Sequence, residues 1–355
     1  MKRKIEKILE EKTSIINEMI ERYIPRKYDR DSLIFTLSQP RYEYNVEALN
    51  KAIAEPIWEF LDRGGKRWRP NLFLLVCEAL GAEPEKLLDF AIIPEVIHNG
   101  TLMIDDVEDS SEDRRGKPCT YKLFGIDIAI NTGNSMYYLP LLTLIKNKDK
   151  LSLDKQNKIY EIYLREMIRL SFGQAMDIAW HKGLAKANEK QYLQMCAYKT
   201  GTLARMAAKM AAVLADASDN TIERMGRFAE TFAVAFQIQD DVLDLIGKEF
   251  AEKKGGLGQD ITEGKRSLMV IHTLEKAKLK DKKRLLEILD AHTTDQKLRD
   301  EAINIIKKYG SIRYAKEFAK SMIEEGWKEI DKLLQSSDAK EKLREFAHYL
   351  VERKI

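Results

Sequence analysis

The chain has 355 residues, enough for one large domain or two ordinary ones. Its 60 lysines and arginines nearly balance 57 aspartates and glutamates, so the net charge gives no argument for nucleic acid or an anionic membrane surface. Three widely separated cysteines, Cys77, Cys119 and Cys196, indicate a reducing compartment without a disulfide framework. No run approaches the ~18 apolar residues of a membrane span, and the N-terminus lacks the apolar core of a signal peptide. We therefore expect a cytoplasmic protein with no membrane span.

Apolar residues recur at helical spacing through most of the chain. An amphipathic helix is predicted over residues 4–24, and helix resumes over 46–62 after an irregular stretch with Pro25 and Pro40 as breakers. Further helices are predicted over 71–80, 86–110, 121–145, 151–181, 190–215 and, in several pieces, 266–355. No alternating strand pattern of useful length is found. The sequence therefore predicts one all-α domain, with an N-terminal helical extension over 1–45, chemical motifs over 45–270 and C-terminal helices over 271–355.

Three aspartates with the spacing Asp-Asp-x-x-Asp lie at Asp105, Asp106 and Asp109. On a helix these positions fall within about 100° of one another, so the three carboxylates can point at one place. Converging anions repel, and Mg²⁺ removes that repulsion because it takes oxygen ligands and shares its shell with substrate phosphates. Arg114 and Arg115 follow, and arginine suits bidentate phosphate contacts. Taken alone, the stretch could equally be the solvated acidic end of a helix.

A second triad, Asp240, Asp241 and Asp244, repeats the same spacing at the end of an otherwise apolar helix. Solvated charge runs do not usually end apolar helices in this way. Two matching triads on separate helices can face each other across a bundle core and hold metal ions between them. The pair is therefore far more specific than either triad alone.

The sequence Gly-Gly-Lys-Arg-Trp-Arg-Pro at 64–70 places Lys66 and Arg69 on a glycine turn, and Pro70 then begins a helix. Cations on such a turn at a helix start form a good anion site. Beside two aspartate triads, the segment indicates a phosphate clamp rather than a solvated loop. His98 lies two turns before the first triad on nearly the same face, which favours a place in the site over a core role.

The helix predicted over 190–215 contains Lys199 among alanines and methionines, where a lysine needs a buried anion or a route to water. Gly201 in the same helix costs ~1 kcal/mol relative to alanine, which indicates a kink or a close contact. The stretch 253–266 is rich in glycine and lysine, and we expect it to form a mobile lid that closes over phosphates. An ordinary helix connector is the alternative.

Together, and in this order, the motifs resemble the trans-isoprenyl diphosphate synthase family over roughly residues 45–270. Around residues 98–138 the chain is most similar to eukaryotic and archaeal geranylgeranyl diphosphate synthases. The resemblance implies an all-α isoprenoid synthase bundle with a central active-site cavity, a homodimer, and three Mg²⁺ ions per active site. It also implies a prenyltransferase that condenses isopentenyl diphosphate head to tail with dimethylallyl, geranyl or farnesyl diphosphate. Geranylgeranyl diphosphate is the expected product, and farnesyl or a longer prenyl diphosphate is the alternative.

The resemblance also implies roles for individual residues. Six carboxylates would hold Mg²⁺ on the allylic diphosphate, directly or through water: Asp105, Asp106, Asp109, Asp240, Asp241 and Asp244. The same diphosphate would be contacted by Arg114, Lys199 and Lys265. Isopentenyl diphosphate would be bound by Lys66, Arg69, His98 and Arg115. Catalytic contacts beside the developing allylic cation would come from Thr200 and Gln237, together with Lys199. Gln174 and Asp177 share a helix face in a further family motif and carry less weight.

One departure from the family pattern concerns its lid lysine. Gly255 and Gly256 stand where that lysine is expected, and Lys254 could replace it from one position earlier. Two other classes of protein stay open. A terpene cyclase usually replaces the second triad with an Asn/Ser/Glu metal motif, and a non-catalytic regulatory subunit would have lost triad residues or the basic clamp. This sequence contains both complete aspartate triads and the basic clamp at 64–70.

The small residues Gly100 and Thr101, one turn before Asp105, leave room for a growing hydrocarbon tail. In the family, bulky aromatic residues at these positions are linked to short products. We therefore expect a product longer than fifteen carbons, with Ile97, Pro94 or a residue of another helix limiting the tail at twenty.

Overall fold

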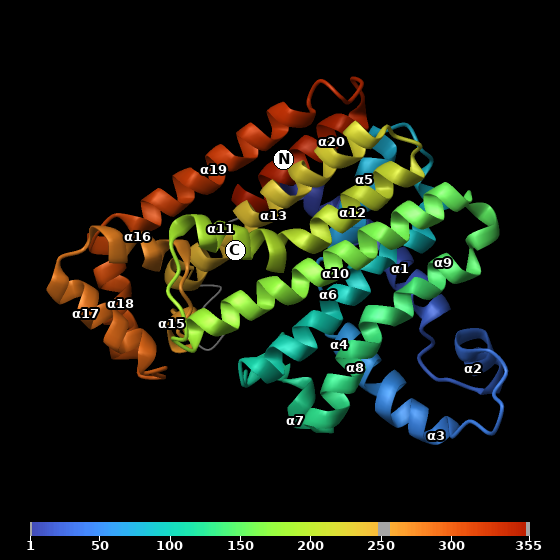
Figure 1. The fold of residues 1–355 in the computed structure, drawn as a ribbon, viewed down its shortest axis with the longest axis horizontal. Helices are drawn as coiled ribbons and strands as arrows, with labels where there is room; N and C mark the ends of the chain where they lie inside the picture. The colour runs from blue at the N-terminus through green and yellow to red at the C-terminus, as the bar shows by residue number, and fades with distance from the viewer. Residues whose placement is uncertain (1, 248–255, 353–355) are drawn as a thin grey trace. The chain divides into compact units, whose positions relative to one another are not determined.

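The structure is a computed structural model that describes residues 2–247 and 256–352. Nearly all of its elements are helices (Figure 1). Within the described residues the one exception is a short antiparallel hairpin, in which β1 (Asp113–Arg114) pairs with β2 (Lys117–Pro118). The predicted all-α fold class is therefore confirmed.

The chain forms two compact units. The N-terminal unit consists of residues 3–160 and 210–217, and the C-terminal unit of residues 1–2, 161–209 and 218–355. The border between them runs through two helices, α10 (Leu153–His181) and α12 (Gly201–Leu214). The single domain that the sequence indicates stays a prediction.

The N-terminal unit is built from helices that range from 4 residues in α3 to 22 in α1. These are α1 (Lys2–Tyr23), α2 (Arg30–Leu37), α3 (Val46–Leu49), α4 (Glu55–Leu61), α5 (Trp68–Ala79), α6 (Leu88–Glu108), α7 (Thr120–Phe124), α8 (Ile126–Tyr138) and α9 (Leu142–Lys146). A π-helical turn, η1 (Asn50–Ala54), joins α3 to α4, and 3₁₀ turns lie at η2 (Pro84–Leu87), η3 (Leu139–Leu141) and η4 (Lys148–Lys150).

Helix α2 lies in a stretch predicted to be irregular, so that prediction was wrong. The helix begins because Asp29 and Ser32 form a capping box: the Asp29 carboxylate accepts from the Ser32 backbone N–H at 2.8 Å, and the Ser32 hydroxyl accepts from the Asp29 N–H at 2.8 Å. Pro25 and Pro40 flank the helix without entering it. Local capping thus produces a helix where the apolar periodicity gives no signal.

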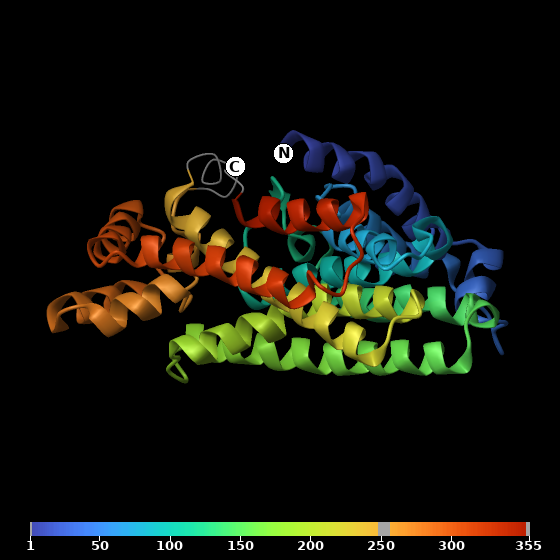
Figure 2. The ribbon, with the colours of Figure 1, turned by 90° about the horizontal axis from the view of Figure 1, so that it is seen from above.

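The core of the N-terminal unit gathers apolar residues from five helices. They are Ile16, Ile20, Tyr23, Ile24, Ile57, Trp58, Phe60, Leu61, Ile92, Val96, Met103, Met136 and Leu142. Helix α6 runs through this core and packs along α8 (Figures 1 and 2). The two helices approach so closely that a Cβ atom on Gly100 would lie 2.7 Å from the Gly133 carbonyl oxygen. Gly100 therefore permits a helix crossing that a larger residue would prevent.

The C-terminal unit is likewise built from helices. These are the greater parts of α10 and α12 together with α11 (Glu189–Lys199), α13 (Asp219–Ile246), α15 (Gln259–Thr262), α16 (Leu268–Lys276), α17 (Leu279–Asp290), α18 (Gln296–Lys308), α19 (Ser311–Ile330) and α20 (Asp338–Glu352). The helix predicted over 190–215 is divided into α11 and α12 at Thr200, next to Gly201, where the sequence indicates a kink.

Helices α13 and α19 pack side by side along most of their length (Figures 1 and 2). Aromatic rings fill the space between them. The ring centroid of Phe228 lies 6.4 Å from that of Phe232 and 5.8 Å from that of Trp327 on α19. The ring centroid of Phe346 on α20 lies 5.9 Å from that of Phe232. Such ring pairs add about 0.5–1.5 kcal/mol each beyond the apolar area that they bury. This packing fixes α13, the helix that carries the second triad.

By length and composition, residues Pro84–Glu108 could cross a membrane. Of the most apolar window in this segment, 67% is buried inside the protein. Because the core helix of a folded protein meets the same criteria, the segment is weak evidence for a membrane span.

Candidate active site

The first triad lies at the carboxyl end of α6. Asp105 and Asp106 are in its last turn, and Asp109 is the C-cap residue. The buried carboxylate of Asp106 accepts from Arg114 Nε at 2.8 Å and from Arg114 Nη2 at 2.5 Å. Burial raises the pKa of Asp106 above its ordinary value, Arg114 opposes that rise, and the charge of Asp105 adds to it. The sequence-predicted triad and its arginine are thus brought together, with a charge repulsion that a cation would relieve.

The hairpin after α6 directs two neighbouring arginines to different places. Its two turn residues, Arg115 and Gly116, have φ of 56° and 76°, in the left-handed region that a two-residue hairpin turn requires. Arg114 on β1 reaches Asp106, whereas Arg115 donates to the Gly64 carbonyl and, at 3.2 Å, to Asn99 Oδ1. Arg114 therefore belongs to the triad and Arg115 to the glycine loop.

The predicted phosphate clamp is gathered around His98. Burial lowers the pKa of His98 well below 6.5, and the charges of Arg69 and Arg115 lower it further, so the imidazole is neutral near pH 7. Burial likewise lowers the pKa of both Arg69 and Arg115 to about 10, which leaves them charged. The guanidinium carbon of Arg69 lies 4.3 Å from the centroid of the Trp68 ring. Lys66 is exposed on the loop that precedes α5. The cluster carries more positive than negative charge and is suited to an anion.

The second triad is part of a hydrogen-bonded chain in the C-terminal unit. Asp241 Oδ2 accepts from the Tyr192 hydroxyl at 2.8 Å, and Asp241 Oδ1 accepts from Gln237 Nε2 at 2.8 Å. The Thr200 hydroxyl donates to Gln237 Oε1 at 3.0 Å. Burial raises the pKa of Asp241 to about 7, and the charge of Asp260 adds to the rise. The structure thus connects Thr200, Gln237 and Asp241, three residues chosen from the sequence.

Lys199 ends α11 and has a carboxylate partner. Its Nζ donates to Asp177 Oδ2 of α10 at 2.7 Å, which provides the anion that a lysine in this packed helix needs. Helix α10 approaches this junction closely, because a Cβ atom on Gly173 would lie 2.4 Å from the Lys199 backbone nitrogen. The close contact and the ion pair together hold the α11–α12 junction against α10.

The described part of the predicted lid begins at Gly256 and contains α15. It is attached to the second triad, since the Asp260 backbone N–H donates to Asp244 Oδ2 at 3.1 Å. Lys265 Nζ in turn donates to Asp260 Oδ1 at 3.1 Å. Lys254, the candidate for the family's lid lysine, lies outside the described residues.

The triads contain the hard oxygen ligands that Mg²⁺ prefers. Among the described residues no three His, Cys, Asp or Glu side chains form a ready-made metal cage. Mg²⁺ is usually held by one or two carboxylates, with water and substrate phosphate completing its shell. The donor set therefore fits Mg²⁺ that is shared with a bound diphosphate.

Of the residues predicted to limit the product, Thr101 and Ile97 lie four and eight positions before Asp105, on one stripe of α6. The Thr101 hydroxyl donates to the His98 carbonyl at 2.7 Å, and Ile97 is buried. Gly100 instead faces α8, so its small size has a packing reason. A role for these residues in product length stays a prediction.

Sequence reasoning missed several residues that hold the site. Tyr192 on α11 and Asn99 and Glu95 on α6 contact predicted site residues or their neighbours. Glu95 could have been noticed, because it is a charged residue in the otherwise apolar stretch 90–97. Tyr192 gives no comparable signal in the sequence.

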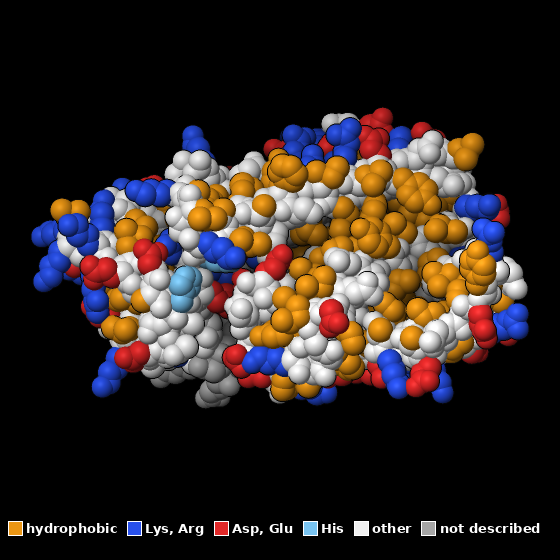
Figure 3. Space-filling model, turned by 60° about the horizontal axis from the view of Figure 1, so that its bottom comes forward, with side chains coloured by type: hydrophobic (Ala, Val, Ile, Leu, Met, Phe, Trp, Pro, Cys, Tyr) orange, Lys and Arg blue, Asp and Glu red, His pale blue; other side chains and the backbone are white. Residues whose placement is uncertain are grey.

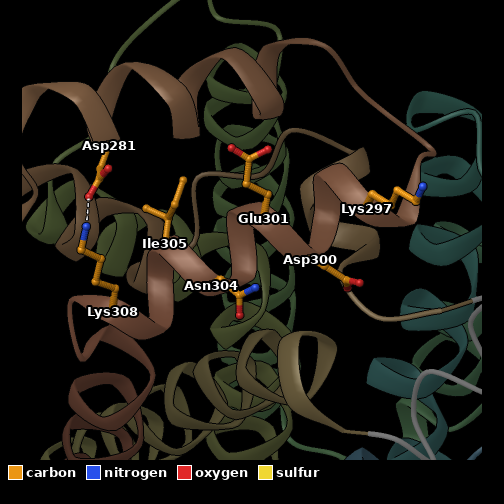
Figure 4. Close-up of a pocket in the computed structure, with 7 residues that line it drawn as sticks. All are labelled: Asp281, Lys297, Asp300, Glu301, Asn304, Ile305 and Lys308. Atoms are coloured by element: carbon orange, nitrogen blue, oxygen red, sulfur yellow. Dashed lines mark hydrogen bonds and ion pairs between the residues drawn. The ribbon is translucent and has the colours of Figure 1, made fainter.

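A hollow of about 470 Å³ is formed by α18 and the start of α17 (Figure 4). It is lined by Asp281, Lys297, Asp300, Glu301, Asn304, Ile305 and Lys308. Lys308 pairs with Asp281 at 2.7 Å, and Arg284 pairs with Glu301 at 2.7 Å, so much of its charge is already neutralised. None of the predicted site residues lines it.

Comparison with known proteins identifies the class. A family model described as polyprenyl synthetase matches residues 50–306. The short chain isoprenyl diphosphate synthase of Methanothermobacter thermautotrophicus is 34% identical over 290 residues, which cover 82% of this chain and 87% of that protein. The geranylgeranyl diphosphate synthase of Methanosarcina mazei is 32% identical over 296 residues, which cover 82% of this chain and 87% of that protein. The crystal structure of geranylgeranyl pyrophosphate synthetase from Pyrococcus horikoshii matches with a TM-score of 0.85, 31% identity and 99% coverage of both chains.

The chain therefore belongs to the polyprenyl synthetase family, and it is a prenyltransferase. The family resemblance and the isoprenoid synthase fold expected from the motifs are both confirmed.

Proposed function

We propose that this prenyltransferase is a Mg²⁺-dependent geranylgeranyl diphosphate synthase. It condenses isopentenyl diphosphate head to tail with allylic diphosphates until the product has twenty carbons. The names of its archaeal relatives support this substrate class and product.

One observation carries the proposal: adjacent arginines divide the cations into two sets. Arg114 is bonded to a triad carboxylate, whereas Arg115 joins Arg69 and His98 in a cluster without triad carboxylates. A condensation of two diphosphates needs two anion sites, one with metal and one without. We assign the triad side to the allylic diphosphate and the clamp to isopentenyl diphosphate.

On the allylic side, the six triad aspartates would hold Mg²⁺, with three ions proposed per active site. The chemistry that Mg²⁺ would supply there is stabilisation of the negative charge that develops on the departing diphosphate. Arg114, Lys199 and Lys265 orient the same diphosphate through charge-assisted hydrogen bonds. Thr200 and Gln237 present hydroxyl and amide oxygen dipoles to the allylic cation. Their mutual hydrogen bond keeps these dipoles oriented before the reaction begins.

On the isopentenyl side, Lys66, Arg69 and Arg115 neutralise the diphosphate, and the neutral imidazole of His98 donates an N–H to it. The carbon–oxygen bond of the allylic substrate breaks, and the double bond of isopentenyl diphosphate forms the new carbon–carbon bond. The proton that is then lost passes to the departed diphosphate. No side-chain base is required, which agrees with the neutral His98 serving in binding.

The tail of the product grows along the stripe of α6 that carries Thr101 and Ile97. Burying the five carbons of each added unit stabilises the longer product by roughly 3–4 kcal/mol, at about 0.8 kcal/mol per carbon group. Elongation therefore continues until a side chain blocks it. We assign that limit to Ile97 or a residue of another helix, at twenty carbons.

The protein acts as a homodimer. In the C-terminal unit, Leu164, Ile168 and Phe172 lie four residues apart on one face of α10 and are 58%, 60% and 66% exposed. In the N-terminal unit, α8 exposes Ile126 and Tyr138 by 56% and 65%. Hydrophobic side chains gather on the surface shown in Figure 3. Exposed apolar helix faces of this kind mark interaction surfaces, and a second copy of the chain would cover them in a homodimer.

The expected location is the cytoplasm, and the expected partners are small diphosphates rather than nucleic acid or a membrane. The free thiols of Cys77, Cys119 and Cys196 are all buried, which suits a reducing compartment.

Incubation with isopentenyl diphosphate and each allylic starter, followed by chromatography, tests the proposal. A twenty-carbon diphosphate from dimethylallyl, geranyl and farnesyl starters is the expected result. A fifteen-carbon product, or a product longer than twenty carbons, would overturn only the proposed chain length. A cyclised hydrocarbon would indicate a terpene cyclase, and no turnover from the folded protein would indicate a regulatory subunit. Sedimentation of the purified protein tests the homodimer separately.

A further inference from the structure

We propose that Glu95 is a positioning residue that holds the isopentenyl diphosphate clamp in its binding geometry. Glu95 lies on α6, three residues before His98. This assignment rests on the proposed function, because it presupposes that the clamp binds a diphosphate. Glu95 itself would not touch the substrate but would act through two neighbours.

The first neighbour is Arg67. Its Nη1 donates to Glu95 Oε1 at 3.1 Å, and the two side chains are only 1% and 3% exposed. Arg67 Nη2 also donates to the Leu61 carbonyl at 3.0 Å. Arg67 has a left-handed φ of 44° and is the N-cap residue of α5. Because Lys66 precedes it and Arg69 follows it by two residues, anchoring Arg67 fixes the path of the loop that presents both clamp cations.

The second neighbour is Asn99. Its Nδ2 donates to the Glu95 carbonyl at 2.8 Å and to Glu95 Oε1 at 3.2 Å, which fixes the amide orientation. Asn99 Oδ1 then faces Arg115 and accepts from its Nη2 at 3.2 Å. One carboxylate thus anchors cations from two separate segments, the glycine loop through Arg67 and the hairpin through Asn99.

The charges around Glu95 leave the cluster ready for an anion. One carboxylate faces three guanidinium groups, and its charge raises the pKa of Arg69 and Arg115 against the effect of burial. Glu95 Oε2 and Arg69 Nε are both buried and have no hydrogen-bond partner among the described residues. Glu95 therefore allows several cations to be buried together without neutralising them all.

The test compares Glu95→Gln with the conservative variant Glu95→Asp. Glutamine keeps the size and the acceptor for Arg67 but removes the charge. Aspartate keeps the negative charge beside Arg67 but shortens the side chain. Glu166→Gln is the matched control, because Glu166 is an equally buried carboxylate that pairs with Arg205 at 2.5 Å. For each variant the Michaelis constants of both substrates and the melting temperature are measured. Calorimetry then gives the dissociation constant of isopentenyl diphosphate without an allylic partner.

We expect Glu95→Gln to raise the Michaelis and dissociation constants of isopentenyl diphosphate about tenfold, with the allylic Michaelis constant unchanged, and Glu95→Asp to raise them less because the charge beside Arg67 is kept. Glu166→Gln should lower the melting temperature and leave the Michaelis and dissociation constants of isopentenyl diphosphate unchanged. Tighter binding in Glu95→Gln would show that Glu95 only offsets positive charge. If Glu95→Gln lowers the melting temperature but leaves the Michaelis and dissociation constants of isopentenyl diphosphate unchanged, the role of Glu95 is purely structural. Either result would overturn the inference while leaving the proposed function intact, whereas failure of the wild type to elongate any starter would reject the function itself.

Discussion

Replacing Gly173 with alanine tests how strongly the reaction depends on the junction between α11 and α12. The new Cβ atom would lie 2.4 Å from the Lys199 nitrogen and 2.6 Å from the Tyr198 carbonyl carbon. Both neighbours are backbone atoms, so no side chain can rotate away. Restoring ordinary contact at 3.4 Å requires a movement of about 1 Å, either of α10 or of the junction that carries Lys199 and Thr200.

The loss of activity should exceed the loss of stability. Overpacking of this kind costs ~1–3 kcal/mol, and alanine recovers up to ~1 kcal/mol through its better helix propensity. At about 2–4 °C per kcal/mol, the melting temperature should fall by less than roughly 10 °C. A displacement of about 1 Å in a group that orients the substrate can cost ~100-fold in rate. We therefore expect kcat to fall by about two orders of magnitude in a protein that is still folded.

Gly326→Ala in α19 is the matched control. The three atoms nearest to its new Cβ atom would all belong to side chains, of Thr231 at 3.2 Å and 3.5 Å and of Phe228 at 3.7 Å, and side chains can adjust more easily than backbone. The assay is steady-state elongation with farnesyl and isopentenyl diphosphates, together with thermal melting of both variants. If folded Gly173→Ala keeps kcat within about threefold of wild type, the contact with α10 does not position the junction and the reasoning is wrong.

Four further predictions concern the proposed sites. Asp105→Ala and Asp240→Ala should each lower kcat ~100–1000-fold, and EDTA should abolish activity until Mg²⁺ is restored; full activity after chelation would rule out the metal. Lys66→Ala removes a charge-assisted contact of ~1.5–3 kcal/mol, so the Michaelis constant for isopentenyl diphosphate should rise at least tenfold, and a rise for the allylic substrate alone would reverse the two assignments. Thr101→Phe should shift the product to fifteen carbons while Thr101→Val does not, and an unchanged product from an active Phe variant would place the tail elsewhere. Since the pKa of His98 is lower in the folded than in the unfolded state, its contribution to the free energy of unfolding is present above pH ~6.5 and is lost as the pH falls below it. Denaturant unfolding between about pH 7 and 5 should show a less favourable change in stability on acidification for the wild type than for His98→Gln, and equal changes would contradict this assignment.

Most helices could be predicted from the sequence because their apolar residues repeat with the helical period over several turns. Helix α2 could not, since its eight residues owe their start to the capping pair Asp29 and Ser32 rather than to a repeating apolar face. The β1–β2 hairpin was missed because two residues per strand are too few to show alternation.

The aspartate triads could be predicted because a fixed spacing on a helix sets the direction of the side chains. The environment of each carboxylate could not, since Tyr192 lies 49 residues from Asp241 in the sequence. Gly100 shows a further limit. Its small size could equally have left room for a substrate tail, and only the position of α8 reveals that it admits a neighbouring helix.

The turn at Arg115 and Gly116 places a constraint on insertions and deletions. Exposed hairpins usually tolerate changes in length. Here, the two-residue turn at Arg115 and Gly116 sets the directions of Arg114 and Arg115, so adding or removing one residue would change both directions. Asp106 would then lose its guanidinium partner, and Asn99 would face a side chain aimed away from it. Among related enzymes, the length of this surface turn should therefore vary less than that of the other connections between helices.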